Sequence, residues 1–186
     1  MYRKLAFVFL FVLLACTTEA GAAEIALTSV GQSPDAVMVN VILKRQKITA
    51  DYDAGMKAAD LAGQNGQKIL IAVVGGSSKG LGAAGIDKNQ ELERSVALIN
   101  AAKSKDIKVL VMHVGGEGRR GELSDAFIVG VVPLADALIT VKGANSDGLF
   151  DKLKPSSVTM LEADTIQTVW GSLEPVLKGW GAAGPQ

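Results

Sequence analysis

The sequence predicts an α/β protein with three layers: a doubly wound, mostly parallel sheet of five or six strands, flavodoxin-like or Rossmann-like. Two observations lead to this prediction. Apolar, β-branched runs alternate along the chain with segments of helical periodicity. The runs at 68–74 and 107–114 are also apolar at nearly every position, which is typical of strands that helices cover on both faces.

Size and charge limit the class of protein further. The chain has 186 residues, enough for one domain, and 48% of them are hydrophobic. Its formal net charge is zero. No excess of basic residues is present to displace counterions from a nucleic acid, so no nucleic-acid partner is expected.

The N-terminus has the layout of a secretory signal peptide, predicted over residues 1–22. Arg3 and Lys4 precede an apolar run at 5–15, and small residues follow up to Ala22. The run is shorter than the roughly 20 residues that a membrane-spanning helix needs. We therefore expect a periplasmic or secreted protein.

Cys16 is the only cysteine, and it lies inside this segment. The string Leu13-Leu14-Ala15-Cys16 resembles a bacterial lipobox, and cleavage before Cys16 would leave a lipid-anchored protein. Cleavage near Ala22 would leave a soluble protein and is favoured, although both sites stay open. After cleavage near Ala22 the chain would have no cysteine for disulfides, metal thiolates or nucleophilic catalysis.

The first half of the domain is predicted to contain three strands, at 25–30, 48–52 and 68–74. Ser33 is the expected N-cap of a helix that starts at Pro34 and runs to about Gln46. A short helix is expected near 54–61. A long glycine-rich loop at 75–85 follows the third strand.

The second half begins with a helix that Asp87 and Gln90 open as a capping box and that ends near Ser104. A strand at 107–114 leads into a second glycine-rich loop at 115–121. The other expected elements are a helix at 122–132, a strand at 137–141, a short helix at 147–153, a strand at 158–162 and a closing helix at 165–178. The domain is predicted to span 23–180, with a disordered tail at 181–186.

The connections favour a particular order of strands. Right-handed crossovers between parallel strands give the order 2-1-3-4-5, with the sixth strand added at the edge. Sheets of this kind bind ligands outside the carboxyl ends of the strands, where the strand order reverses. That position lies between the first and third strands.

Two successive strands end in similar strings, Val74-Gly75-Gly76-Ser77-Ser78-Lys79 and Val114-Gly115-Gly116-Glu117-Gly118-Arg119. Glycines let a backbone approach a ligand closely, and successive free N–H groups form an anion-binding nest. Lys79, Arg119 and Arg120 supply positive charge. We expect the two loops to lie side by side and to bind a small anion such as a carboxylate, phosphate ester or nucleotide fragment.

The predicted ligand-binding residues lie at the ends of strands and in both loops. They are Ser29, Gln32, Ser33, Gly75, Gly76, Ser77, Ser78, Lys79, Gly80, Gly82, Gly115, Gly116, Arg119, Arg120 and Lys142. His113, the only histidine, is a candidate general base or ligand contact, and Glu117 would orient it or accept a hydroxyl of the ligand. Structural roles are the alternative for both residues. No metal site is expected. The chain has one histidine, and its one cysteine, Cys16, lies in the predicted signal peptide, so the ligands for a zinc cluster are lacking.

The string Gly75-Gly76-Ser77-Ser78-Lys79-Gly80-Leu81-Gly82 resembles the nucleotide-binding turn of short-chain dehydrogenases, with Gly75 in place of their threonine. The resemblance implies a nicotinamide cofactor. That family also needs a Tyr-x-x-x-Lys downstream, whereas Tyr2 and Tyr52 both lie upstream of the loop. Its loop follows the first strand and not the third. A redox role is therefore not favoured, and the cofactor is left open.

Nearly the whole predicted domain resembles an uncharacterised family of exported bacterial proteins, a domain of unknown function. The resemblance rests on Gly31-Gln32-Ser33-Pro34 and on the segments 75–85 and 115–125. It implies no activity, so it supports only the domain limits and the importance of these loops.

Three functions remain open. The favoured one is an exported small-molecule-binding protein that presents an anion to a membrane transporter or another envelope protein. A small hydrolase or transferase with His113 as base is the second, and an interaction module without a small ligand is the third. Binding is favoured over catalysis because basic donors are abundant and catalytic groups are few. The oligomeric state stays open.

Overall fold

The computed structural model describes residues 23–63 and 66–182. The predicted signal peptide, both cleavage sites and Cys16 lie outside the described residues. No helix in the described part of the chain is long and apolar enough to cross a membrane.

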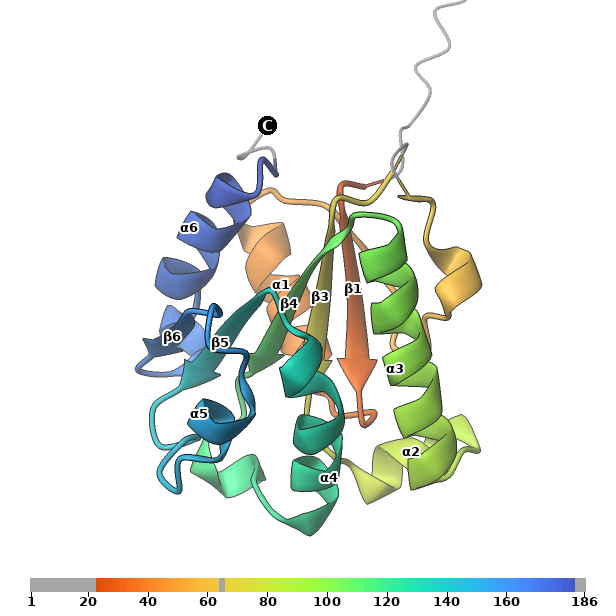
Figure 1. The fold of residues 1–186 in the computed structure, drawn as a ribbon, viewed down its shortest axis with the longest axis vertical. Helices are drawn as coiled ribbons and strands as arrows, with labels where there is room; N and C mark the ends of the chain where they lie inside the picture. Colours follow the sequence, from red (N-terminus) through yellow and green to blue (C-terminus); the bar gives the residue numbers. More distant parts are fainter. Residues whose placement is uncertain (1–22, 64–65, 183–186) are drawn as a thin grey trace, which may run out of the picture.

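Six parallel strands form one sheet in the order β2-β1-β3-β4-β5-β6, which confirms the predicted topology (Figure 1). Neighbouring strands end at nearly the same level. β1 pairs with β3 from Ile25 opposite Ile69 to Val30 opposite Val74, and β3 continues in register with β4. The strands are β1 (Ile25–Val30), β2 (Ala50–Tyr52), β3 (Ile69–Val74), β4 (Lys108–His113), β5 (Ala137–Val141) and β6 (Met160–Ala163).

Helices cover both faces of the sheet, as the apolar strands predict (Figure 1). α1 (Asp35–Arg45) and α6 (Trp170–Gly179) pack on one face, and α3 (Lys88–Ser104) and α4 (Glu122–Val131) pack on the other. Two short helices, α2 (Ser78–Ala84) and α5 (Leu149–Leu153), lie toward the carboxyl edge (Figure 1). The 3-10 turns are η1 (Ala58–Asp60), η3 (Glu117–Arg119), η4 (Val132–Leu134) and η5 (Ile166–Thr168).

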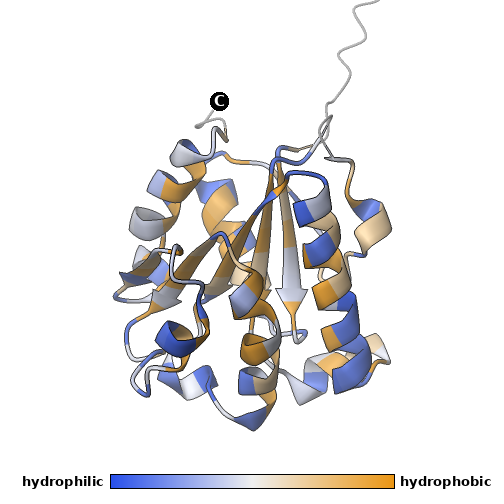
Figure 2. Ribbon diagram, in the orientation of Figure 1, coloured by the Kyte–Doolittle hydropathy of each residue, from blue (hydrophilic) through white to orange (hydrophobic). Residues whose placement is uncertain are grey.

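The strands supply the centre of two apolar cores, one on each face of the sheet (Figure 2). β3 shows the division most clearly, because all six of its residues are buried and alternate between the two cores. Phe127 and Phe150, both fully buried, fill the core beneath α3 and α4. Burial of this apolar surface on both faces is the main stabilising contribution to the fold.

The predicted helix caps are present. The Ser33 hydroxyl accepts the backbone N–H of Asp35 at 3.1 Å and so caps the start of α1. Asp87 and Gln90 form the expected reciprocal capping box at the start of α3.

The prediction of a loop over 75–85 is wrong at most of these positions, because Ser78–Ala84 form the helix α2. The Ser77 hydroxyl accepts the Gly80 N–H at 3.0 Å and caps the helix. Leu81 anchors the helix with a buried side chain, and Gly85 ends it in the left-handed conformation with φ +68°. The many glycines in this segment favoured the prediction of a loop, although the Ser77 cap and the Gly85 terminus are ordinary helix signals.

Two other predicted boundaries need correction. The helix expected near 54–61 is only the turn η1, and the closing helix is divided into η5 and α6. The ordered chain also extends past residue 180. Gly181 and Ala182 donate their N–H groups to Lys178 and Leu177 at 3.1 and 3.0 Å, a Schellman motif that buries Ala182 against α6.

Candidate ligand site at the carboxyl edge

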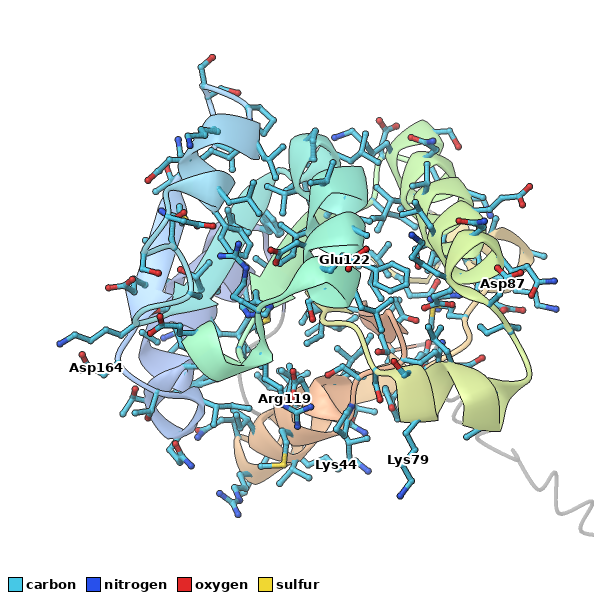
Figure 3. All side chains as sticks on the ribbon, turned by 90° about the horizontal axis from the view of Figure 1, so that it is seen from below. Lys44, Lys79, Asp87, Arg119, Glu122 and Asp164 are labelled. Carbon is cyan, nitrogen blue, oxygen red and sulfur yellow. The ribbon has the colours of Figure 1, made fainter. Side chains whose placement is uncertain are left out.

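The loops that follow β1, β3 and β4 lie together at the carboxyl edge of the sheet. The strands are parallel and in register, so Gly31, Gly75 and Gly115 follow them at nearly the same level. Strand order reverses at β1 and β3. The two diglycine turns therefore follow neighbouring strands, as predicted, and Figure 3 looks onto their edge of the sheet.

The first diglycine turn, Gly75–Gly76, is bonded to the protein itself. The N–H groups of Gly75 and Ser77 donate to the carbonyl oxygens of Val30 and Gly31, each at 2.9 Å. The Gly76 N–H donates to the Ser124 hydroxyl at 2.9 Å. The prediction of bare amides at this turn is wrong, because these amides join β3 to the end of β1 and to α4.

The glycines of this segment admit neighbouring parts of the chain. A Cβ on Gly76 would stand 2.7 Å from Leu123 Cγ and 2.8 Å from the Ser124 nitrogen. A Cβ on Gly80 would overlap the backbone oxygen of Gln32. Gly76 and Gly80 therefore make room for other parts of this chain, whereas Gly82 has nothing within 4 Å of its Cβ position.

The second diglycine turn, Gly115–Gly116, differs in its hydrogen bonding. The bonds of η3 begin with the N–H groups of Arg119 and Arg120, which donate to Gly116 and Glu117 at 3.2 and 3.0 Å. Among the described residues, no acceptor receives the four preceding N–H groups, those of Gly115, Gly116, Glu117 and Gly118. Gly116 has φ +65° and ψ −165°, a conformation that favours glycine. We call residues 115–118 the open turn.

Arg119 follows the open turn and has an exposed side chain. The Cβ and Cγ of Arg119 lie over Gly115, where a Cβ on Gly115 would overlap them. No ion pair joins its guanidinium to a carboxylate in the described part of the chain. Figure 3 shows Arg119 on this edge, with Lys79 pointing outward from α2.

Arg120, also expected to bind the ligand, is engaged within the protein. Its guanidinium pairs with Asp125 at 2.6 Å and Asp147 at 2.9 Å, bonds to the Ala144 carbonyl oxygen, and lies 5.4 Å from the Phe150 ring centre. Its hydrogen bonds to Asp125 and then Asp147 raise the pKa of the guanidinium further above its usual value. The hydrogen bond from Arg120 lowers the pKa of Asp147 to about 2. Arg120 therefore holds the loop after β5 to α4.

His113 is fully buried at the end of β4. Its Nδ1 lies 2.9 Å from the Val74 carbonyl oxygen and its Nε2 lies 3.2 Å from that of Gly116. Its ring also packs 5.6 Å from that of Phe150. Both ring nitrogens face carbonyl oxygens within the protein, so neither is directed toward a substrate, and the ring lies between the end of β3 and the open turn.

Most polar residues at the end of β1 also bond internally. The Ser29 hydroxyl donates to the Ser33 carbonyl oxygen at 3.1 Å. The Gln32 side-chain amide donates to the Ala54 carbonyl oxygen at 3.0 Å and to Glu91 at 3.2 Å. The remaining predicted site residues with exposed side chains are Ser78, Lys79, Glu117 and Lys142.

Sequence reasoning missed Asp35, a carboxylate that lies close to the first glycine of both diglycine turns. Asp35 is only 6% exposed, and its Oδ2 has no hydrogen-bond partner in the part of the chain that the structure describes. This oxygen lies 3.3 Å from the Cβ position of Gly75 and 3.1 Å from that of Gly115. In the sequence, Asp35 has the signature of an acidic residue in the first turn of a helix, which gave no reason to single it out.

A buried ion pair supports the site from α3 and was also missed. Glu91, fully buried, accepts the Gly31 N–H at 2.9 Å and pairs with Arg94 at 2.8 Å. Arg94 donates to the carbonyl oxygens of Ser29 and Met56, each at 2.6 Å. We call this pair the Glu91–Arg94 clamp, because it fixes the end of β1 beside the first turn.

The described residues contain no group of three His, Cys, Asp or Glu side chains that could hold a metal ion. Comparison with known proteins adds one finding: a family model described as a domain of unknown function (DUF6305) matches residues 22–177. No curated protein and no solved structure matches the chain.

Proposed function

The chain belongs to the family described as a domain of unknown function (DUF6305), and we propose that it binds a small anion on the open turn. A carboxylate, a phosphate ester or a nucleotide fragment would suit this turn. The observation that carries the proposal is the run of four consecutive N–H groups, at residues 115–118, that have no acceptor among the described residues.

The chemistry of the turn favours an anion. Successive amides that lack internal acceptors can donate to the oxygens of a negatively charged group. Gly116 is buried, and an unpaired N–H in a buried residue costs free energy that a ligand oxygen would offset. Arg119 adds a full positive charge whose planar guanidinium suits bidentate contact with a carboxylate or phosphate.

Two exposed lysines extend the positive charge around the turn. Lys79 lies on α2, which follows β3, and Lys142 lies after β5. Their positions on the two sides of the loop after β4 follow from the strand order. We assign them to the rim of the site, where charges increase the rate of anion capture more than the affinity.

Binding is favoured over catalysis. The candidate base His113 is buried with both ring nitrogens at carbonyl oxygens. With the predicted signal peptide, this leads us to propose an exported binding protein. It would deliver its anion to a membrane transporter or another envelope protein.

The test is calorimetric titration of the purified protein with acetate, phosphate and adenosine monophosphate, preceded by a thermal-shift screen. We expect Arg119→Ala to weaken the binding of the best anion at least tenfold. Arg45→Ala is the matched control, because this exposed arginine ends α1, which runs back from the carboxyl edge. The proposal fails if no anion binds, or if Arg119→Ala binds as the wild type does.

A further inference from the structure

We propose that the ligand is a zwitterion of the amino-acid type, whose ammonium group binds the Asp35 carboxylate while its anionic group occupies the open turn. This inference rests on the proposed function and adds the class of ligand. It starts from the carboxylate that the anion-binding hypothesis alone leaves unexplained.

Asp35 differs from the other buried carboxylate of the described chain. Glu91 is fully buried, and its oxygens accept from Gly31, Gln32 and Arg94. The Oδ2 of Asp35 is buried and has no such partner. A carboxylate oxygen removed from water without a donor is unfavourable, so a group that supplies the donor would bind there with a substantial gain in free energy.

The free oxygen of Asp35 lies next to the open turn. It stands 3.1 Å from the Cβ position of Gly115, the first residue of that turn. The Cβ and Cγ of Arg119 also lie close to this Cβ position of Gly115. The carboxylate oxygen and the base of the Arg119 side chain therefore meet at Gly115, the first residue of the open turn, whose four amides have no acceptor among the described residues.

Arg119 is the part of this arrangement that can move to admit a ligand. Its Cβ and Cγ and the Asp35 oxygen both lie near the Cβ position of Gly115, whereas the Arg119 side chain is exposed and free of ion pairs among the described residues. Rotation about the side-chain torsions of Arg119 would move its Cγ and guanidinium without a change in the backbone, while its Cβ would stay in place. The same guanidinium would then face the anionic group of the ligand.

This arrangement selects against a plain anion. A ligand with only negative charge would lie beside the Asp35 carboxylate and would supply no positive group to it, and the resulting repulsion would disfavour such a ligand. An α-amino acid carries an ammonium group one carbon away from its carboxylate. Such a molecule supplies a charged donor to Asp35 and charged acceptor oxygens to the turn.

The test compares ligands that differ only at the amine. We would titrate the full chain with a panel of L-amino acids, with the carboxylic acid that lacks the amino group of each, and with each N-acetylated amino acid. We expect the best amino acid to bind at least tenfold more tightly than its two partners. Equal affinities for all three would overturn the inference and leave anion binding intact. If none of the three binds and phosphate also fails, the proposed function fails as well.

Variants give a second readout. Asp35→Asn should remove the preference for the amino acid over its deaminated partner, while binding of that partner persists. Asp164→Asn is the control, because Asp164 is an exposed carboxylate that follows β6 on the same edge (Figure 3). A preference that survives in Asp35→Asn would contradict the inference. If the variant does not fold, the comparison with N-acetylated ligands on the wild type still tests the ammonium subsite.

Discussion

Glu91 on α3 accepts the backbone N–H of Gly31 at 2.9 Å, across 60 positions of the sequence. This bond ties the first turn of α3 to the start of the loop where strand order reverses. Arg94, whose side chain is 12% exposed, completes the pair and holds the carbonyl oxygens of Ser29 and Met56. The Glu91–Arg94 clamp thus fixes the end of β1 beside the first diglycine turn.

Loss of this clamp should be costly. We expect Glu91→Ala to lower the free energy of unfolding by about 3–5 kcal/mol, because it leaves Arg94 nearly buried without its counter-charge. Urea unfolding monitored by circular dichroism would measure the change. Glu93→Ala on the same helix is the control, since Glu93 is exposed, and should lie within about 0.5 kcal/mol of wild type. Equal effects of the two substitutions would show that the clamp is not structural.

Two glycines of α2 should respond to alanine in opposite directions. Gly80→Ala should destabilise the protein by more than about 1 kcal/mol, because its Cβ would overlap the Gln32 backbone oxygen, which cannot move aside as a flexible side chain can. Gly82→Ala has nothing within 4 Å of its Cβ position and should stabilise the helix by about 0.5–1 kcal/mol. Thermal unfolding of both variants checks this contrast. A neutral Gly80→Ala would mean that α2 does not pack against the loop after β1.

The Arg120 ion pairs predict a loss of stability in acid. The pKa of Asp147 is lowered from 3.8 to about 2, chiefly by its hydrogen bond to Arg120, and Arg120 also lowers the pKa of Asp125. A carboxyl group with a lowered folded-state pKa binds protons more readily when unfolded, so it stabilises the fold above its unfolded pKa. Its contribution is lost as the pH falls from 3.8 toward about 2.

Denaturant unfolding across this pH range tests the assignment. Asp147→Asn should be less stable than wild type at pH values well above 3.8, and the difference should shrink as the pH approaches about 2. Asp164→Asn, at an exposed carboxylate on the same edge, is the control variant. A difference between Asp147→Asn and wild type that stays constant with pH would show that the Arg120–Asp147 pair does not form.

The fold was accessible from the sequence because its signals are local. The apolar runs are the strands themselves. The Ser33 cap and the Asp87–Gln90 capping box lie directly at the start of the helices that they stabilise. The strand order then followed from the general handedness of parallel connections. α2 was missed for a local reason too, because its glycines outweighed the Ser77 cap in the interpretation.

The site was less accessible because its hydrogen bonds connect distant parts of the chain. The Gly76 amide finds its acceptor in Ser124, 48 positions away, so the two similar diglycine strings acquire different roles. Arg119 and Arg120 are adjacent in sequence, yet only Arg120 meets carboxylates from α4 and from the loop after β5. The lack of a hydrogen-bond partner for Asp35 Oδ2 depends on residues that surround it in the fold, so a local sequence pattern cannot predict it.

The most direct test of the central claim is nuclear magnetic resonance of isotope-labelled protein during titration with an anion or amino acid that binds. We predict saturable shifts of the backbone amide signals of Gly115, Gly116, Glu117 and Gly118. The signals of Gly75, Gly76 and Ser77 should move little, because their N–H groups already donate to Val30, Ser124 and Gly31. Saturable shifts at the first turn with none at residues 115–118 would contradict the account.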